Sequence, residues 1–204
     1  MKPTNTGVLH SLEKRFTTAV VPWLPKWATT RRLTLTTVVW CVLCVVFYYL
    51  SLGNRVFLLA VSLVIIFQYV TDILDGAVGR YRKTGLVLWG YYMDHLLDYL
   101  FLCSVAAGFY FLFPDSVYPF LYLVLFGAFF ANAFLKYGIL KEFVISMGVF
   151  SISELRFVII GVNLLLYRGL DSVVATYLFP LGMITGSVFF LLDVYKTQKK
   201  VFNR

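Results

Sequence analysis

Residues 55–98 read RVFLLAVSLVIIFQYVTDILDGAVGRYRKTGLVLWGYYMDHLLD, and this stretch decides the fold. An apolar run is followed by a polar break and then by a second apolar run. A membrane-crossing helix needs roughly 20 mostly apolar residues, so each run predicts one crossing. We expect the chain to turn back in the polar break, from Gly76 to about Val87. The two crossings are then neighbouring antiparallel helices.

Comparable apolar runs occur on both sides of this pair. Of the 204 residues, 60% are hydrophobic and only 14% are charged, which is more apolar surface than one soluble core of this length hides. The runs are continuous and lack the alternation of membrane β-strands. The sequence therefore predicts an all-α integral membrane protein with six transmembrane helices, at about 34–52, 55–74, 88–113, 117–136, 152–168 and 173–194.

The positive charges are unevenly distributed along the chain. The formal net charge is +8, and all Lys and Arg residues except Arg55 and Arg168 fall on one side if the N-terminus is cytoplasmic. Because basic residues concentrate in cytoplasmic loops, we expect both termini in the cytoplasm. Attraction to anionic lipid explains the net charge better than nucleic-acid binding.

The segment before the first span has an amphipathic pattern. Leu9, Leu12, Phe16 and Val20 recur at intervals of three and four, which predicts a helix lying in the cytoplasmic headgroup layer. A disordered tail with chance periodicity is the alternative. The expected organisation is an interfacial segment at 1–33, the membrane domain at 34–196 and a basic cytoplasmic tail at 197–204.

Four of the ten acidic residues lie at the ends of the two central spans: Asp72, Asp75, Asp94 and Asp98. Spacings of three and four place each pair on one helical face, so two antiparallel helices can present four carboxylates to one point. Such charges near hydrocarbon normally pair, bind ions or line a wet cavity. One or two hard divalent cations fit these oxygen ligands best. The alternative is an ion-pair network that only joins the helices.

Small residues and a guanidinium accompany the acids. Gly76, Gly79 and Gly90 each remove a side chain, which would let a phosphate or a base approach the backbone closely. Arg80 can donate two parallel hydrogen bonds to phosphate oxygens. Glycines in membrane helices are more often packing contacts, so it is their placement among the aspartates that indicates a site.

Residues 72–98 resemble the signature of CDP-alcohol phosphotransferases, D-x2-D-G-x2-A-R and then, eight or nine residues later, G-x3-D-x3-D. The segment TTRRLTL, at 29–35, is similar to the P-N-x-L-T-L motif before the first span of that family. Two departures are Gly79 in place of Ala, and Val87 where relatives often carry Ser or Thr, a role open to Thr84. The matched positions are Asp72, Asp75, Gly76, Gly79, Arg80, Gly90, Asp94 and Asp98.

The resemblance implies six helices around a polar cavity open to the cytoplasm, commonly in a homodimer. It implies transfer of a phosphatidyl or phospho-alcohol group from a CDP-alcohol to a hydroxyl acceptor, a lipid or a polyol, with release of CMP and with Mg²⁺ or Mn²⁺. The four aspartates would bind metal, and Asp98 would also act as the base. The nucleotide would contact a wider set: Gly76, Gly79, Arg80, Gly90, Thr34 and Thr84.

The donor and the acceptor stay open. The chain length resembles that of enzymes that use CDP-diacylglycerol, whereas DHLLD is similar to the D-H-G-x-D of choline and ethanolamine phosphotransferases. His95 is a competing base. Lys136, Glu154 and Arg156 lie at the inner ends of the fourth and fifth spans, where they could bind a polar acceptor. Rival functions are a divalent-cation transporter and a noncatalytic lipid-binding scaffold.

Overall fold

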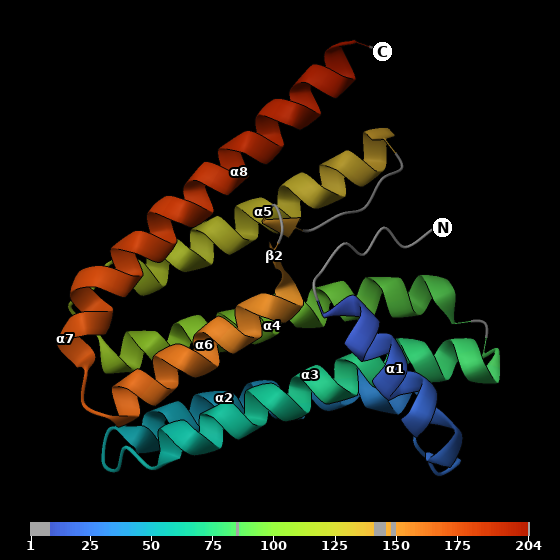
Figure 1. The fold of residues 1–204 in the computed structure, drawn as a ribbon, viewed down its shortest axis with the longest axis horizontal. Helices are drawn as coiled ribbons and strands as arrows, with labels where there is room; N and C mark the ends of the chain where they lie inside the picture. Colours follow the sequence, from blue (N-terminus) through green and yellow to red (C-terminus); the bar gives the residue numbers. More distant parts are fainter. Residues whose placement is uncertain (1–8, 85, 141–145, 148–149, 204) are drawn as a thin grey trace.

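The computed structural model describes residues 9–84, 86–140, 146–147 and 150–203. Nearly all of them are helical (Figure 1). The helices are α1 His10–Val20, α2 Thr30–Ser51, α3 Phe57–Arg82, α4 Val87–Leu112, α5 Tyr118–Leu140, α6 Ile152–Tyr167, α7 Asp171–Val173 and α8 Phe179–Phe202, with a 3₁₀ turn at Val21–Trp23 and a π-helical turn at Val174–Leu178. Two short antiparallel strands, β1 Ser146–Met147 and β2 Phe150–Ser151, precede α6.

Five helical segments of the described chain are long and apolar enough to cross a membrane. They are α2, α3, α4, α5 and the continuous segment Asp171–Phe202, which contains α7 and α8. The architecture is that of an all-α, multi-pass membrane protein. The expected span at 152–168 coincides with α6, whose 16 residues fall short of the roughly 20 needed for a full crossing. Six crossings therefore remain a prediction.

The helix boundaries correct the expected turn between the second and third spans. We expected a connection from Gly76 to about Val87, but α3 continues to Arg82 and α4 begins at Val87. Lys83 ends α3 in the left-handed conformation with φ 52°, and the Thr84 N–H donates to the Gly79 carbonyl. Asp72 and Asp75 thus lie within a helix that holds their side chains in fixed register.

Helices α2, α3 and α4 pack together, with α6 on α3, α5 on α4 and α8 on α5. In Figure 1, α5 and α8 diverge from the rest of the bundle toward the C-terminus. Tyr48 of α2 is fully buried, and its hydroxyl donates to the Asn163 Oδ1 of α6 at 2.9 Å. A Cβ added at Gly108 of α4 would overlap the Tyr48 ring, so α2 and α4 approach closely at this point.

The expected N-terminal helix is confirmed as α1, His10–Val20. Leu12 and Phe16 on its apolar face are exposed, as an interfacial helix requires, although its place in the headgroup layer remains a prediction. The Tyr69 hydroxyl of α3 donates to Glu13 Oε1 at 2.9 Å and joins α1 to the helical bundle. Arg82 donates to four backbone carbonyls in the turn before α2, those of Leu24, Pro25, Lys26 and Ala28.

Candidate metal centre

Three of the four aspartates converge. Asp72 of α3 and Asp94 and Asp98 of α4 each offer a carboxylate oxygen, and these atoms lie within 4.8 Å of one another. The expected spacing argument holds for them, although α3 and α4 are brought together mainly by packing of both helices against α2. Asp75 lies outside this group: its Oδ2 accepts a 2.6 Å hydrogen bond from the Thr34 hydroxyl of α2. The acidic cluster therefore consists of a trio and an adjoining carboxylate held by α2.

A buried arginine lies against the trio. Arg156 of α6 is 4% exposed, and its Nη2 donates to Asp72 Oδ2 at 2.9 Å and to Asp98 Oδ1 at 2.8 Å. From the sequence we expected Arg156 at an acceptor site and did not expect it to contact the acids. One guanidinium thus bridges carboxylates from α3 and α4. This contact supports the alternative that the acids belong to an ion-pair network that joins the helices.

One guanidinium does not balance the cluster. Four carboxylates face a single buried Arg, so negative charge remains in excess unless protons or cations neutralise it. The ion pairs of Arg156 are with Asp72 and Asp98, whereas Asp94 Oδ2 lies 3.6 Å from the Nδ1 of neighbouring His95. The Asp94 side chain is 34% exposed, whereas that of Asp98 is 11% exposed. A cation arriving from solvent would therefore reach Asp94 first.

The donor set fits a hard divalent cation. Mg²⁺, Mn²⁺ and Ca²⁺ prefer carboxylate oxygens, and the trio supplies three from two rigid helices. Two bonds of about 2.0–2.6 Å to one cation span at most about 5 Å, which includes the observed separation. For Mg²⁺, at about 2.1 Å, the most distant oxygens would have to close by several tenths of an ångström.

The hydrogen bond from Thr34 to Asp75 gives a test of how the fourth carboxylate is held. Replacing Thr34 with Val leaves a buried carboxylate oxygen without its donor, which should lower the free energy of unfolding by about 1–3 kcal/mol. Thr34→Ser, which keeps the hydroxyl, is the matched control. Thermal unfolding of both purified variants in the same detergent measures the difference, and equal melting temperatures would show that the bond contributes nothing.

Gly79, near the end of α3, is a packing contact between α2 and α3. A Cβ added at Gly79 would lie 3.0 Å from the Thr30 Oγ1 and 3.6 Å from the Thr84 Oγ1, so the missing side chain brings both hydroxyls close to the α3 backbone. Thr30 is buried, and its hydroxyl has no hydrogen-bond partner in the described part of the chain. Because Thr30 fills the space beside Gly79, close helix packing explains this glycine.

Gly76, Arg80 and Gly90 were also expected to contact the nucleotide, and their surroundings differ. A Cβ added at Gly76 would lie 3.2 Å from the Arg80 Nη1, because the Arg80 side chain folds back over this glycine. A Cβ added at Gly90 would meet no atom within 4 Å, so packing does not explain that glycine. Gly76 and Arg80 thus lie together with the acids on α3, while Gly90 is one turn before Asp94 on α4.

Two polar residues at the centre, Gln68 and Tyr69, were not predicted from the sequence. Gln68 is fully buried, with its Nε2 3.5 Å from Asp98 Oδ1. The Tyr69 ring lies 5.6 Å from the Arg156 guanidinium carbon. Gln68 shares one face of α3 with Asp72, Asp75 and Gly79 at helical spacing, a polar stripe that could have revealed it. No local pattern links Tyr69 to Arg156, which is far away in the sequence.

His95 lies beside Asp94, with its Nδ1 3.6 Å from Asp94 Oδ2, and its ring extends toward Phe134 of α5. Its ring packs edge-on against Tyr91, with the centroids 4.6 Å apart, and it lines an apolar groove of about 610 Å³ between α4 and α5. Asp98 lies instead on the side of α4 that meets Gln68 and Arg156. The geometry favours Asp98 over His95 as the group nearest the other carboxylates.

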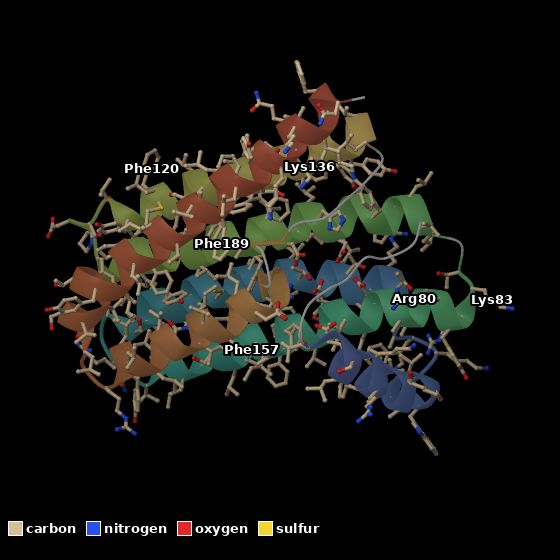
Figure 2. The ribbon with its side chains drawn as sticks, turned by 45° about the horizontal axis from the view of Figure 1, so that its top comes forward. Arg80, Lys83, Phe120, Lys136, Phe157 and Phe189 are labelled. Carbon is tan, nitrogen blue, oxygen red and sulfur yellow. The ribbon has the colours of Figure 1, made fainter. Side chains whose placement is uncertain are left out.

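Lys136 and Glu154 do not join the trio. Lys136 of α5 pairs with Asp193 of α8 at 2.7 Å, and the Asn132 amide donates to the same carboxylate at 2.7 Å. Figure 2 shows Lys136 beside α8, whereas Arg80 and Lys83 lie toward the far end of α3. Glu154 is in the first turn of α6 and half-buried. Of the three predicted acceptor residues, Arg156 alone contacts the acidic cluster.

Lys136 can be tested for a structural role. Lys136→Met removes the cation from a largely buried pair and should cost about 1.5–3 kcal/mol of stability, while Lys136→Met combined with Asp193→Asn should recover part of this loss. A double-mutant cycle by thermal unfolding gives the coupling between the two residues. Complete additivity would mean that the pair does not hold α8 to α5.

The centre therefore combines carboxylates from α3 and α4, a hydroxyl from α2 and a guanidinium from α6. Each of these groups comes from a different part of the chain, and three of the four helices are long enough to cross a membrane. Comparisons with protein families, curated proteins and solved structures find no match to this chain.

Proposed function

We propose that this chain is a metal-dependent membrane transferase that moves a phosphatidyl or phospho-alcohol group from a CDP-alcohol to a hydroxyl acceptor and releases CMP. CDP-diacylglycerol is the favoured donor. The observation that carries the proposal is the convergence of the Asp72, Asp94 and Asp98 oxygens within 4.8 Å, in a cluster that Arg156 only partly neutralises. The signature-like spacing of residues 72–98 supports the assignment of the substrate class.

In this proposal, Asp72, Asp94 and Asp98 would hold Mg²⁺ or Mn²⁺, and the adjoining Asp75 would be a ligand of a second cation. The metal would neutralise charge on the diphosphate as CMP departs. Asp98 accepts the proton of the attacking hydroxyl. Its contacts with Arg156 and Gln68 suit this role, because they fix the direction of the carboxylate.

Arg80 suits the diphosphate of the donor. Its guanidinium folds over Gly76 beside the acids, and a guanidinium that turns toward the metal centre can bind two phosphate oxygens. Gly79 supports this part of the site indirectly, because it lets Thr30 of α2 pack closely against α3.

The finer topology belongs to the same proposal. Six crossings place both termini and the acids at the cytoplasmic face, with a polar cavity open to that side, and two copies form a homodimer. The distribution of Lys and Arg supports this orientation. The acceptor is a lipid or a polyol whose polar group lies near Arg156.

Two alternatives make different predictions. A CDP-choline or CDP-ethanolamine phosphotransferase would use the same centre with diacylglycerol as the acceptor. A divalent-cation transporter would bind the metal without any preference for nucleotide. Offering radiolabelled CDP-diacylglycerol and CDP-choline to membranes that contain the protein, with a panel of acceptors, separates the two transferases.

Binding of CMP tests the shared centre. The purified protein should bind CMP only with Mg²⁺ or Mn²⁺ present, and Asp94→Asn should abolish this binding, because Asp94 is the most exposed ligand of the trio. Asp171→Asn, which changes an aspartate at the opposite end of the helices, is the matched control. Calorimetric titration measures both. CMP binding that persists in EDTA would refute the proposed geometry, and metal binding without CMP binding would favour a transporter.

A further inference from the structure

A second charged feature lies at the other end of the molecule from the acidic cluster. An apolar groove of about 530 Å³ is lined by Leu59 of α3 and by residues of α6 and the turn after it: Leu164, Leu165, Tyr167, Arg168 and Leu170. Leu59 and Asp72 are thirteen residues apart on α3, which is about 20 Å along the helix. The groove is therefore separate from the acidic cluster.

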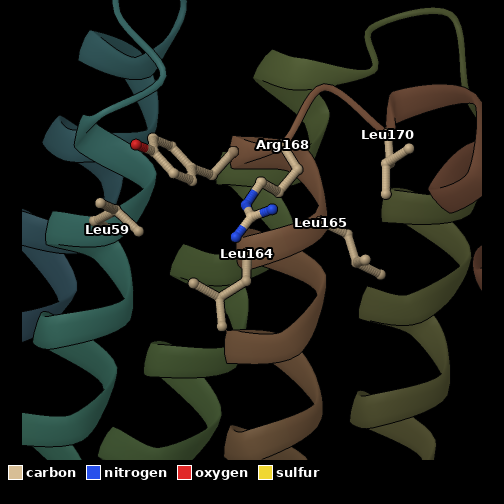
Figure 3. Close-up of a pocket in the computed structure, with 6 residues that line it drawn as sticks. Leu59, Leu164, Leu165, Arg168 and Leu170 are labelled. Carbon is tan, nitrogen blue, oxygen red and sulfur yellow. The ribbon is translucent and has the colours of Figure 1, made fainter.

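Arg168 is the only charged residue that lines this groove. Figure 3 shows its side chain extending back from the end of α6, toward Leu164, into the space between α3 and α6. The side chain makes no hydrogen bond or ion pair with any residue that the structure describes. A cation against hydrocarbon is costly unless an anion accompanies it.

The neighbouring charges do not supply that anion. Asp171 is already paired with Arg55 at 2.8 Å, and Arg55 also donates to the Leu166 carbonyl. The two turns that meet here, at 52–56 and 168–171, thus hold two arginines and one aspartate. These three residues carry a net charge of +1, and the positive charge left after the Arg55–Asp171 pair is that of Arg168, which points into the groove.

The depth of the groove in the bilayer indicates which anion would pair with Arg168. Tyr167 is the last residue of α6, and Phe57 is the first residue of α3, so the groove begins at the end of α3, which is long enough to cross a membrane, and at the end of the shorter α6. Lipid phosphates lie at this level, with their acyl chains directed toward the helix middles. Leu164 lies on the side of Arg168 toward the middle of the helices, and Leu59 lies across the groove on α3, so a chain could run along both.

We propose that this groove binds one glycerophospholipid of the leaflet opposite the acidic cluster, with its phosphate on Arg168 and an acyl chain along Leu59 and Leu164. A guanidinium binds phosphate oxygens through paired, charge-assisted hydrogen bonds. The leucines bury the chain, which gives the site its preference for a lipid over a free phosphate. The site is independent of the proposed transferase activity.

Native mass spectrometry of the full chain in detergent tests the site. Phosphatidylglycerol, phosphatidylcholine and diacylglycerol with the same acyl chains are added in turn. Both phospholipids should bind, diacylglycerol should not, and Arg168→Gln should weaken phospholipid binding about five-fold. Lys199→Gln, which removes an exposed cation from the end of α8, is the matched control and should bind as the unaltered protein does.

A second variant tests the apolar half of the site. Leu164→Trp fills the groove but keeps Arg168, and it should weaken phospholipid binding to a similar extent. Three outcomes would overturn the proposal: unchanged binding in Arg168→Gln, equal binding of diacylglycerol, or a loss limited to phosphatidylglycerol that Leu164→Trp does not share, which would indicate surface electrostatics alone. Cross-linking between copies through Leu164→Cys would instead assign the groove to a dimer interface.

Discussion

Asp98→Asn should lower the rate of phosphatidyl transfer about 10²–10⁴-fold, the usual contribution of a positioned general base. The amide keeps the size of the carboxylate and can still accept a hydrogen bond from Arg156, which contacts Asp98 Oδ1 at 2.8 Å. Metal-dependent CMP binding should therefore persist while turnover is lost. Release of labelled CMP from CDP-diacylglycerol measures the rate, and calorimetry measures binding on the same preparation.

His95→Gln is the control for this experiment. His95 packs against Tyr91 and lines the groove between α4 and α5, so its replacement should leave most of the activity. Substantial turnover in Asp98→Asn together with a large loss in His95→Gln would transfer the role of the base to His95. Loss of CMP binding in Asp98→Asn would mean that this carboxylate serves mainly as a metal ligand.

Arg156→Met should destabilise the protein more strongly than Thr34→Val or Lys136→Met when no divalent cation is present. The guanidinium is buried between Asp72 and Asp98, and removing one partner from a buried ion pair costs about 3–5 kcal/mol. The remaining carboxylates then repel one another without a counterion. Adding Mn²⁺ should restore much of the lost stability, because the cluster keeps all of its oxygen ligands.

Thermal unfolding in EDTA and in Mn²⁺ provides the measurement. Arg55→Gln is the control, since its pair with Asp171 is about half exposed and worth little in comparison. If Arg156→Met loses the same stability with and without Mn²⁺, the acids form only an ion-pair network and the metal centre is excluded. A stabilising effect of Mn²⁺ that is larger in Arg156→Met than in the unaltered protein supports the metal centre.

The all-α membrane architecture and the convergence of three aspartates were predictable from the sequence, whereas the extent of α3 was not. Asp72, Asp94 and Asp98 were expected together because spacings of three and four on adjacent helices leave little freedom. The extent of α3 was mispredicted, since hydropathy marks where a chain leaves hydrocarbon, whereas the helix continues through Gly76 and Arg80 to Arg82. A helix needs backbone hydrogen bonds and not apolar side chains to continue.

The residues that contact the aspartates could not be predicted from the sequence, because these contacts depend on how distant segments pack together. Arg156 lies 58 residues after Asp98, whereas the basic residue expected beside the acids was Arg80, on the same helix as Asp72 and Asp75. Arg82 binds backbone carbonyls in the turn before α2. Lys136 was assigned to an acceptor without regard to Asp193, which a later helix brings beside it.

The close contact of Tyr48 with Gly108 has a consequence for the distant carboxylates. Thr34 and Asp94 each lie fourteen residues before this contact on α2 and α4, which is about 21 Å along each helix. A change of about 5° in the angle between α2 and α4 at this contact would move Thr34 and Asp94 relative to each other by about 2 Å. Because a shift of about 1 Å in a reacting group can cost about 10²-fold in rate, the packing of the Tyr48 ring against the α4 backbone would affect how accurately the groups of the proposed reaction meet.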